Sequence, residues 1–274
     1  MKELAPAKVN LCLYLGPVRP DGYHELLSVI QSITLADSLE LNDHSAASDE
    51  VRCAALPGPN LATDAIAAFR RTTGWDGPPQ LLEIEKRIPI AAGLGGGSAD
   101  AAATLRLLAR RSGLGTPAEL HEIATRLGAD VPSQLVPGRW LAEGIGERLI
   151  RLPDPDDFGV VILPSKAALS TGAVYQEADR LNLPRSSDEF NALRQTLDVL
   201  EIEPINDLQP AARSLDSTLD KALRVLPGSI VAGSGPTVIA LFHKLEDARS
   251  AAARVALAGR DAKAAGAVHN SASA

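Results

Sequence analysis

Alternating apolar and polar positions near the N-terminus predict the first strand of this chain. From Val9 to Leu15 every second residue is apolar, which is the period of a half-buried strand. Apolar positions between 28 and 41 predict a further strand. Residues 82–89 predict another strand, and this one leads directly into a segment rich in glycine.

Helical spacing of apolar residues predicts helices over 61–71 and 100–111, before and after that glycine-rich segment. A third helix begins with a strong signal, because Thr116 can cap it and Glu119 stands at the capping-box position. Gly128 should end this helix, since glycine readily takes the left-handed conformation found at helix ends.

The segment 152–157 is rich in proline and aspartate, and it predicts an exposed link between two domains. We therefore expect domains over 1–153 and 158–269, with paired strands over 140–152 near the end of the first. The second domain should be α+β. Its expected elements are strands over 158–163, 229–232 and 237–242 and helices over 173–181, 188–200, 211–225 and 245–257, followed by a fraying tail at 270–274.

The glycine-rich segment is the strongest candidate for a ligand site. It consists of Pro89, Ile90, Ala91, Ala92, Gly93, Leu94, Gly95, Gly96, Gly97, Ser98 and Ala99. A backbone built of glycines can approach a ligand closely, and its amides meet the positive end of the next helix dipole. Such a loop binds anions, and we expect it to hold the phosphates of a nucleotide.

Spacing excludes two common phosphate loops. No lysine follows the glycines, as the P-loop requires, and Ser98 stands where a dinucleotide fingerprint has its third glycine. The sequence also lacks the protein-kinase motifs H-R-D and D-F-G. A plain turn is the alternative, but four glycines within five residues cost much conformational entropy for an ordinary turn.

Two charged residues are candidates for chemistry, and each has a plainer alternative. Lys8 shares a strand face with Asn10, and alone it would be a solvated lysine whose stem covers apolar neighbours. Asp130 precedes a candidate helix, and alone it would be a helix N-cap. Phosphoryl transfer to an alcohol, however, needs a carboxylate that accepts the hydroxyl proton and a fixed cation near the same oxygen.

Composition narrows the class of partner. The 274 residues carry a formal net charge of -7, which disfavours nucleic acid and anionic membranes, so phosphorylated ligands need local binding features. Aromatic residues make up 3%, which predicts a core of aliphatic side chains and alanine. Cys12 and Cys53 lack metal-ligand spacing, the histidines are scattered, and no apolar run reaches membrane-spanning length. We expect a protein of the reducing cytoplasm.

The glycine segment, with its leading Pro89, resembles the P-x-x-x-G-L-G-[SG]-[SG]-S-A motif of the GHMP kinases, which include galactokinase, homoserine kinase and mevalonate kinase. Residues 232–237 resemble their third motif, although a tight hairpin is a compatible description. The resemblance implies an α+β, two-domain GHMP kinase fold, with a ribosomal protein S5 domain 2-like N-terminal domain and a GHMP C-terminal α+β domain. It also implies ATP binding and phosphoryl transfer to a small-molecule hydroxyl.

The segments around Lys8 and Asp130 resemble one branch of this superfamily. The acceptor of that branch is the 2-hydroxyl of a cytidine diphosphate ester, and its product serves isoprenoid precursor synthesis by the non-mevalonate route. The resemblance implies that Asp130 is the general base and that Lys8 is the cation beside the attacking oxygen.

Residues 19–26 resemble the R-x-D-G-[YF]-H segment of the same branch, in which the positions matching Tyr23 and His24 recognise cytidine. A tyrosine face can stack on a pyrimidine, and histidine can bond its polar edge. The resemblance also places Asn10, Thr171 and Tyr175 at the substrate, while Tyr175 could equally be a core residue of its helix.

The chemistry of the resemblance calls for Mg²⁺ to offset phosphate charge, and Ser98 is the candidate oxygen ligand. One rival interpretation is another GHMP kinase, of the mevalonate or homoserine type. A second is a ligand-binding relative without catalysis, although such a protein would be expected to lose Lys8 or Asp130. The sequence does not indicate an oligomeric state.

Overall fold

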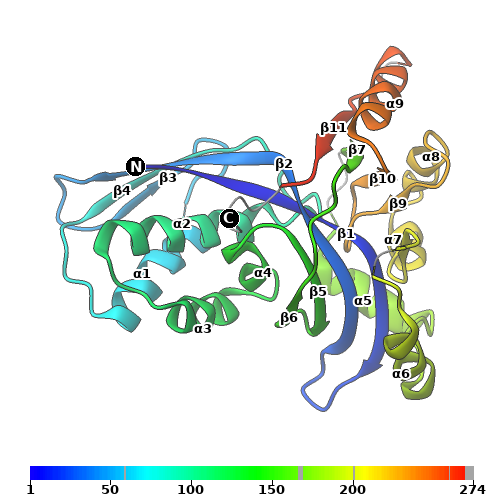
Figure 1. Ribbon diagram of the computed structural model, residues 1–274, viewed down its shortest axis with the longest axis horizontal. Coiled ribbons are helices and arrows are strands. Elements are labelled where there is room, and N and C mark those ends of the chain that lie inside the picture. The colour runs from blue at the N-terminus through cyan, green and yellow to red at the C-terminus, as the bar shows by residue number, and fades with distance from the viewer. Residues whose placement is uncertain (59, 166–168, 200, 259, 269–274) are drawn as a thin grey trace. The chain divides into compact units, whose positions relative to one another are not determined.

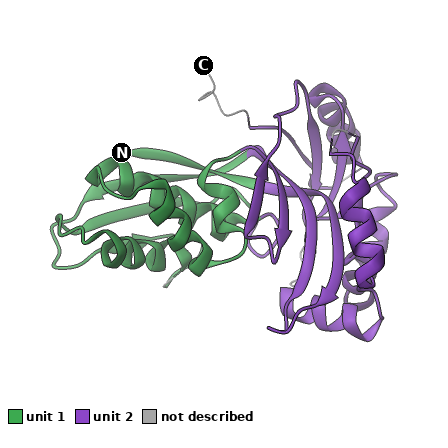
Figure 2. Ribbon diagram, turned by 60° about the horizontal axis from the view of Figure 1, so that its bottom comes forward, with its two compact units in different colours: residues 1–7, 35–88, 95–137 green, residues 8–34, 89–94, 138–274 purple. Residues whose placement is uncertain are grey.

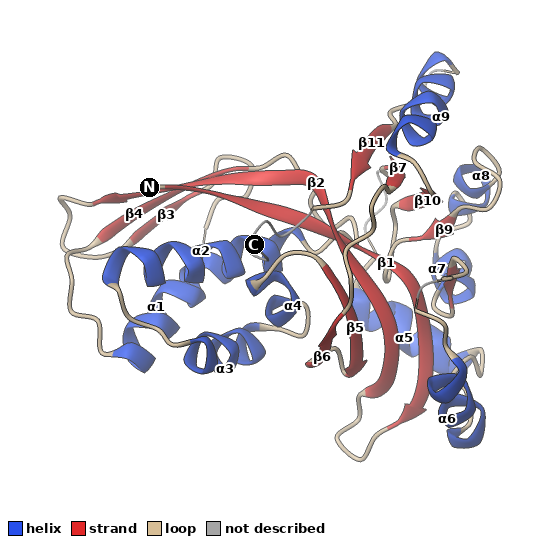
Figure 3. Cartoon of the chain, viewed as in Figure 1, coloured by secondary structure: helices blue, strands red, loops and turns tan. Residues whose placement is uncertain are grey.

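The computed structural model describes residues 1–58, 60–165, 169–199, 201–258 and 260–268. Helices and strands occur along the whole described chain (Figure 3), and the predicted α+β class is confirmed. Figure 1 labels these elements. In chain order they are β1 (Lys2–Val18), β2 (His24–Asp43), β3 (Glu50–Arg52), α1 (Leu61–Thr73), β4 (Gln80–Glu85), α2 (Gly96–Ser112), α3 (Pro117–Leu127), α4 (Val131–Leu135), β5 (Arg139–Gly144), β6 (Arg148–Arg151), β7 (Gly159–Leu163), α5 (Thr171–Arg180), α6 (Ser187–Thr196), β8 (Ile205–Asn206), α7 (Gln209–Leu215), α8 (Leu219–Leu223), β9 (Ile230–Val231), β10 (Val238–Phe242), α9 (Leu245–Leu257) and β11 (Lys263–Gly266).

The chain forms two compact units, each built from separate stretches of sequence (Figure 2). Unit 1 comprises Met1–Ala7, Leu35–Ile88 and Gly95–Pro137, and unit 2 comprises Lys8–Thr34, Pro89–Leu94 and Gly138–Ala274. Strands β1 and β2 therefore contribute residues to both units, and so does the glycine segment. The domain bounds expected from the sequence, 1–153 and 158–269, differ from these units and stay a prediction.

In unit 1, β3 pairs parallel with β4, β4 pairs antiparallel with β2, and β1 follows β2. The four helices α1 to α4 lie on one face of these strands (Figure 3). Strand β4 shows the matching alternation, because Leu82 and Ile84 are buried while Glu83 and Glu85 are exposed. This is the half-buried pattern that a one-sided sheet requires.

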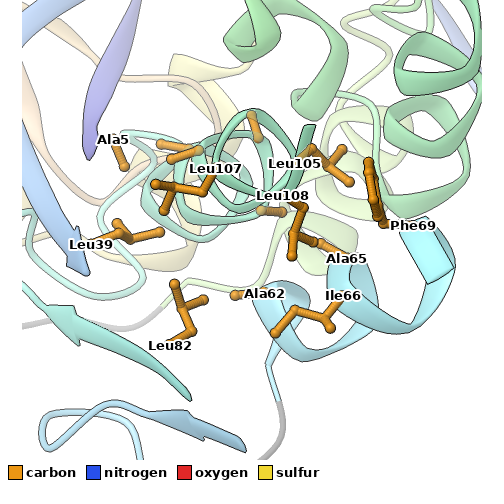
Figure 4. Packing of buried hydrophobic residues seen from close by; sticks show 14 of the residues in the cluster. Ala5, Leu39, Ala62, Ala65, Ile66, Phe69, Leu82, Leu105, Leu107 and Leu108 are labelled. Carbon is orange, nitrogen blue, oxygen red and sulfur yellow. The ribbon is translucent and has the colours of Figure 1, made fainter. Parts of the chain in front are cut away.

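The core of unit 1 is mainly aliphatic and alanine-rich, as expected from the low aromatic content (Figure 4). Helix α2 supplies most of it, through buried alanines from Ala99 to Ala103 and through Leu105, Leu107 and Leu108. Among the described residues of this core, Phe69 is the one fully buried aromatic side chain. Helix α3 begins at the predicted capping box.

In unit 2, β5 pairs antiparallel with β2 and with β6, and β1 pairs parallel with β8. A second sheet has the order β11-β7-β10-β9, with all its pairs antiparallel. Leu13 and Leu15 of β1 join the core that this sheet forms with its helices. The predicted buried strand over 158–163 and the predicted hairpin around residue 234 are both confirmed.

Several expectations for individual elements were wrong. Strand β1 is buried on both faces from Ala5 to Gly16. Its polar side chains Lys8 and Asn10 bond each other, and Asn10 also bonds Ser28 of β2, so these groups have partners without facing solvent. The helix predicted over 211–225 is two helices, α7 and α8. Asp216 interrupts it with an extended backbone, and its carboxylate accepts bonds from the backbone and hydroxyl of Thr218.

Other boundaries moved less. The helix predicted over 188–200 ends as α6 at Thr196, and the strand predicted over 82–89 ends as β4 at Glu85. The short strands β3, β8 and β11 were missed, since pairing over two to four residues is decided by tertiary neighbours. The tail at 270–274 lies outside the described residues. No helix within the described ranges is long and apolar enough to cross a membrane.

Candidate active site

The first half of the glycine segment belongs to unit 2 and is held against the β9–β10 hairpin. Gly93 has a φ of +75°, in the left-handed region that glycine adopts more readily than other residues. A Cβ on Gly93 would lie 2.4 Å from the carbonyl oxygen of Ala232 and 3.0 Å from that of Gly235. Two backbones therefore meet here at a distance that excludes any side chain, so the loop and the hairpin fix each other.

The second half of the segment belongs to unit 1 and starts α2. Gly95 is the N-cap, with φ +69° and no side-chain capping bond, and the amide of Ala99 makes the first helical bond to the Gly95 carbonyl at 2.9 Å. The amides of Gly96, Gly97 and Ser98 precede that bond, so the helix itself supplies no acceptor for them. Together with the helix dipole they form an anion-binding helix start.

Lys8 lies on β1 in unit 2 and is only 5% exposed, so the solvated alternative is wrong. Its Nζ donates to Asn10 Oδ1 at 2.9 Å, and Asn10 Nδ2 donates to Ser28 Oγ at 2.7 Å. Ser28 in turn donates to the Cys12 carbonyl at 2.6 Å. This chain of bonds fixes the orientation of both predicted side chains.

Lys8 also lies at the junction of the two glycine motifs in unit 2. Its backbone amide donates to the Leu94 carbonyl at 3.0 Å. A Cβ built on Gly233 would lie 3.3 Å from the Gly93 carbonyl and 3.9 Å from Lys8 Nζ. The structure thus brings together Lys8, Asn10, the start of the glycine segment and the C-terminal motif, which are far apart in sequence.

His24 and Tyr175 form a second cluster in unit 2. His24 is buried, and its Nε2 lies 2.8 Å from Asp179 Oδ1, while its ring centroid is 5.4 Å from that of Tyr175. Tyr175 and Asp179 stand one turn apart on α5, and Tyr175 also packs against the unit 2 core. The neighbouring Tyr23, by contrast, is 61% exposed. Sequence reasoning missed Asp179, although its i+4 spacing from Tyr175 could have indicated it.

Thr171 begins α5, whose N-cap is Ser170. Its Oγ1 lies 3.0 Å from the hydroxyl of Ser234, which stands between the two glycines of the C-terminal motif. The motif, Thr171 and the Lys8 junction are therefore linked within unit 2.

Asp130 belongs to unit 1 and stands at the N-cap position of α4. Its φ of -85° and ψ of -14° are helical, and its side chain makes no capping bond, so the N-cap alternative is not what the structure shows. The residue is half-buried. Lys8 belongs to the other unit, and the coupling of the two as a catalytic pair stays a prediction.

A buried charge cluster in unit 1, made of Asp37, Lys86 and Asp100, was not predicted. Lys86 Nζ donates to Asp37 Oδ2 at 2.5 Å and to Asp100 Oδ2 at 2.7 Å. Asp37 Oδ1 also accepts from the amides of Arg87 and Ile88, at 2.5 and 2.8 Å. Lys86 thus ties the chain that enters the glycine segment to the first turns of the helix that leaves it.

Burial dominates the electrostatics of this cluster. It raises the pKa of the Asp100 carboxyl to about 7, although Lys86 opposes the rise, and Asp37 adds to it. For Lys86, burial lowers the pKa, but Asp100 and Asp37 outweigh it, and the net pKa is raised. Two acids thus share one ammonium, so the second carboxylate is the costlier one to ionise.

Comparison with known proteins first gives the class. The family description "GHMP kinases N terminal domain" matches residues 60–138, which include the start of α2 and Asp130. The crystal structure of homoserine kinase from Cytophaga hutchinsonii has a TM-score of 0.71 at 17% identity, covering 98% of this chain and 95% of that one. The fold is that of the GHMP kinases, as expected from the sequence, and the family match includes the second half of the glycine segment.

The branch follows from nearer relatives. The 4-diphosphocytidyl-2-C-methyl-D-erythritol kinase of Anaeromyxobacter sp. (strain K) is 40% identical over 275 residues, covering 94% of this chain and 85% of that protein. A crystal structure of 4-(cytidine 5'-diphospho)-2C-methyl-D-erythritol kinase has a TM-score of 0.79 at 32% identity, covering 98% and 100%. This chain belongs to the 4-diphosphocytidyl-2-C-methyl-D-erythritol kinase family.

The close backbone approach at Gly93 gives a first prediction. Gly93→Ala should lower the free energy of unfolding by about 2 kcal/mol or more, because the new methyl group combines positive φ with overlap on a carbonyl oxygen. Gly97→Ala is the matched control, since its Cβ would meet only Leu61 Cδ1 at 3.7 Å and alanine favours helices. Urea unfolding without nucleotide measures both, and equal losses would contradict the argument.

The raised pKa of Asp100 gives a second prediction. Between pH 4 and 7 the folded state keeps a proton that the unfolded carboxyl releases, so the contribution of Asp100 to stability falls as pH rises. Asparagine does not titrate. The free energy of unfolding of Asp100→Asn relative to the native chain should therefore rise by at least about 1.4 kcal/mol between pH 5 and 8, the value of one pKa unit. A difference that stays flat in denaturant titrations would contradict this.

Proposed function

We propose that this chain transfers the γ-phosphoryl group of ATP to the 2-hydroxyl of 4-diphosphocytidyl-2-C-methyl-D-erythritol, in the non-mevalonate route to isoprenoid precursors. The products are the 2-phosphate and ADP. The observation that carries the proposal is the buried Lys8 ammonium, held by Asn10 beside Gly93 and Gly233, in a chain of this kinase family. We also assign the domains 1–153 and 158–269 and a cytoplasmic location to the enzyme.

In this reaction the glycine segment binds the phosphates of ATP. The amides at the start of α2 donate to the phosphate oxygens, and the first turn of α2 has no acidic residue that would repel them. The nucleotide site extends over residues 89–99. Binding by amides suits a chain with a net charge of -7, because it needs no basic patch.

Asp130 accepts the proton of the 2-hydroxyl as its oxygen attacks the γ-phosphorus. The bond between that phosphorus and the oxygen bridging to the β-phosphate breaks, and ADP leaves with the electron pair. Lys8 stabilises the negative charge on the reacting oxygens, and its fixed bond to Asn10 means that little reorganisation is needed. The reaction thus has a base and a cation with separate structural supports.

The cytidine is recognised by the cluster around His24. The Asp179 carboxylate accepts from Nε2, which holds the ring in place; in the tautomer with its proton on Nε2, Nδ1 is an acceptor. Cytosine presents an amino donor on its polar edge, which matches this tautomer. Tyr23 is exposed and free to stack on the base, and Tyr175, Asn10 and Thr171 complete the substrate site.

Magnesium accompanies ATP in this chemistry, where it neutralises charge on the transferring phosphoryl group. Among the described residues no group of three or more His, Cys, Asp or Glu side chains could hold a metal ion. The hydroxyl of Ser98, in the first turn of α2, is an oxygen donor of the kind magnesium takes. These donors fit an ion bound mainly by phosphates and water, with Ser98 as its ligand from this chain.

An acceptor panel tests the function. We expect the purified chain to release ADP with 4-diphosphocytidyl-2-C-methyl-D-erythritol at a kcat/KM at least about a hundredfold above those for mevalonate, homoserine and galactose. A cytidine diphosphate ester without the acceptor hydroxyl should inhibit competitively. Preferred turnover of mevalonate or homoserine would move the chain to another GHMP activity, and binding of the cytidyl ester without ADP release would indicate a relative without catalysis.

Substitution of the proposed base, Asp130, tests the mechanism. Asp130→Asn should lower kcat by at least about a hundredfold, the usual scale for a positioned base, with ATP affinity within about twofold. Asp247→Asn is the control, because it makes the same chemical change in the first turn of α9. Steady-state rates and nucleotide titration measure both variants. Native kcat in Asp130→Asn would remove Asp130 from the mechanism.

A further inference from the structure

Helix α4 is too short to hold its own geometry. It has five residues, and isolated helices of that length are unstable in water. Asp130 stands directly before it, held locally by Ser133, whose hydroxyl donates to the Asp130 carbonyl at 2.9 Å. The direction of the Asp130 carboxylate therefore depends on what the rest of unit 1 does to α4.

Arg106 on α2 bonds α4 from the side. Its Nη1 donates to the Gln134 carbonyl at 2.5 Å, its Nη2 to the Leu4 carbonyl at 2.9 Å, and its Nε to Glu3 Oε1 at 3.0 Å. All these residues belong to unit 1. One guanidinium thus joins α2, the start of β1 and the last turn of α4.

The bond to Gln134 acts as a C-terminal cap supplied by another helix. Carbonyls in the last turn have no partner within the helix, and a cation there also complements the helix dipole. Arg106 is mostly buried, which lowers its pKa, while Glu3 opposes that shift. An arginine remains charged in this setting, and losing it would leave a buried carbonyl without its donor.

We propose that Arg106 is a positioning residue for Asp130. It fixes α4 against α2, the helix whose first turn carries the phosphate-binding amides, and so sets the direction of the carboxylate that takes the hydroxyl proton. This inference rests on the proposed role of Asp130 as the base. Packing also holds α4, since its residues Val131 to Gln134 are buried; the bond from Arg106 adds a directed hydrogen bond at its last turn.

Arg110 offers a matched comparison on the same helix. It lies one turn further along α2 and bonds Glu3 Oε2 at 2.5 Å and the Lys2 carbonyl at 3.2 Å. Its side chain is 51% exposed, against 17% for Arg106. The two arginines share Glu3 as a partner, and Arg106 adds the bond to α4.

Arg106→Met should lower kcat roughly tenfold, because a small misplacement of a reacting group costs this much or more, while the KM for ATP stays within about twofold. Arg106→Lys should retain part of kcat, since lysine keeps a donor. Arg110→Met should keep native kcat, and so should Glu3→Gln, which removes the shared ion pair but leaves the bond to Gln134. Thermal melting of each variant checks that it is folded.

A double-mutant cycle separates positioning from general destabilisation. In the Asp130→Asn background, Arg106→Met should change kcat by less than about twofold, because the group it positions is already gone. A full tenfold loss in that background, or native kcat in Arg106→Met alone, would overturn the inference. Native kcat in Asp130→Asn would instead overturn the proposed base itself, so the two failures are distinguishable.

Discussion

A loop that binds anions through its amides must leave those amides to the ligand, so its own conformation has to be held by other groups. In this chain the two halves of the glycine segment are held differently. The half in unit 2 is held by backbone contact, at the Gly93 and Gly233 approach. The half in unit 1 is held by ion pairs. Lys86, just before the segment, bonds both Asp37 of β2 and Asp100, just after the segment. Neither of these supports uses the amides of Gly96, Gly97 and Ser98.

The second support, the cluster of Asp37, Lys86 and Asp100, has an electrostatic cost. Two buried carboxylates around one ammonium carry an excess negative charge next to a site meant for anions, which would oppose phosphate binding. The raised pKa of Asp100 relieves this, since a proton on that carboxyl makes the cluster neutral. Asp37, by contrast, accepts hydrogen bonds from three donors, namely Lys86 and the amides of Arg87 and Ile88. The two acids therefore differ: the pKa of Asp100 is raised, while Asp37 is the acid that binds the backbone before the glycine segment.

The sequence predicted much of this fold because many of its signals are local. The capping box at Thr116, the glycine segment and the apolar strands are visible within windows of a few residues, and the structure confirms them. The misses depend on distant partners. Strand β1 was expected to have a polar, exposed face, but Lys8 and Asn10 satisfy each other in its interior. Lys86 and Arg106 look like ordinary charged residues in the sequence, and their structural roles depend on partners far away in the chain, such as Asp37 and Gln134.

Specificity for the acceptor has to come from side chains, because proteins named as other kinases share the fold. The homoserine kinase neighbour has the same fold at 17% identity, so the backbone does not select the acceptor. Within unit 2, Tyr23 and His24 are adjacent but differ in exposure, because β2 begins between them. His24 is the first residue of β2 and is buried, with α5 as its neighbour. Tyr23 lies before the strand and is exposed. Asp179 Oδ1 lies 2.8 Å from His24 Nε2 and holds the ring in place. For the proposed cytidine site, a hydrogen-bonding edge beside an exposed aromatic ring suits a pyrimidine, since one would fix its orientation and the other would cover its face.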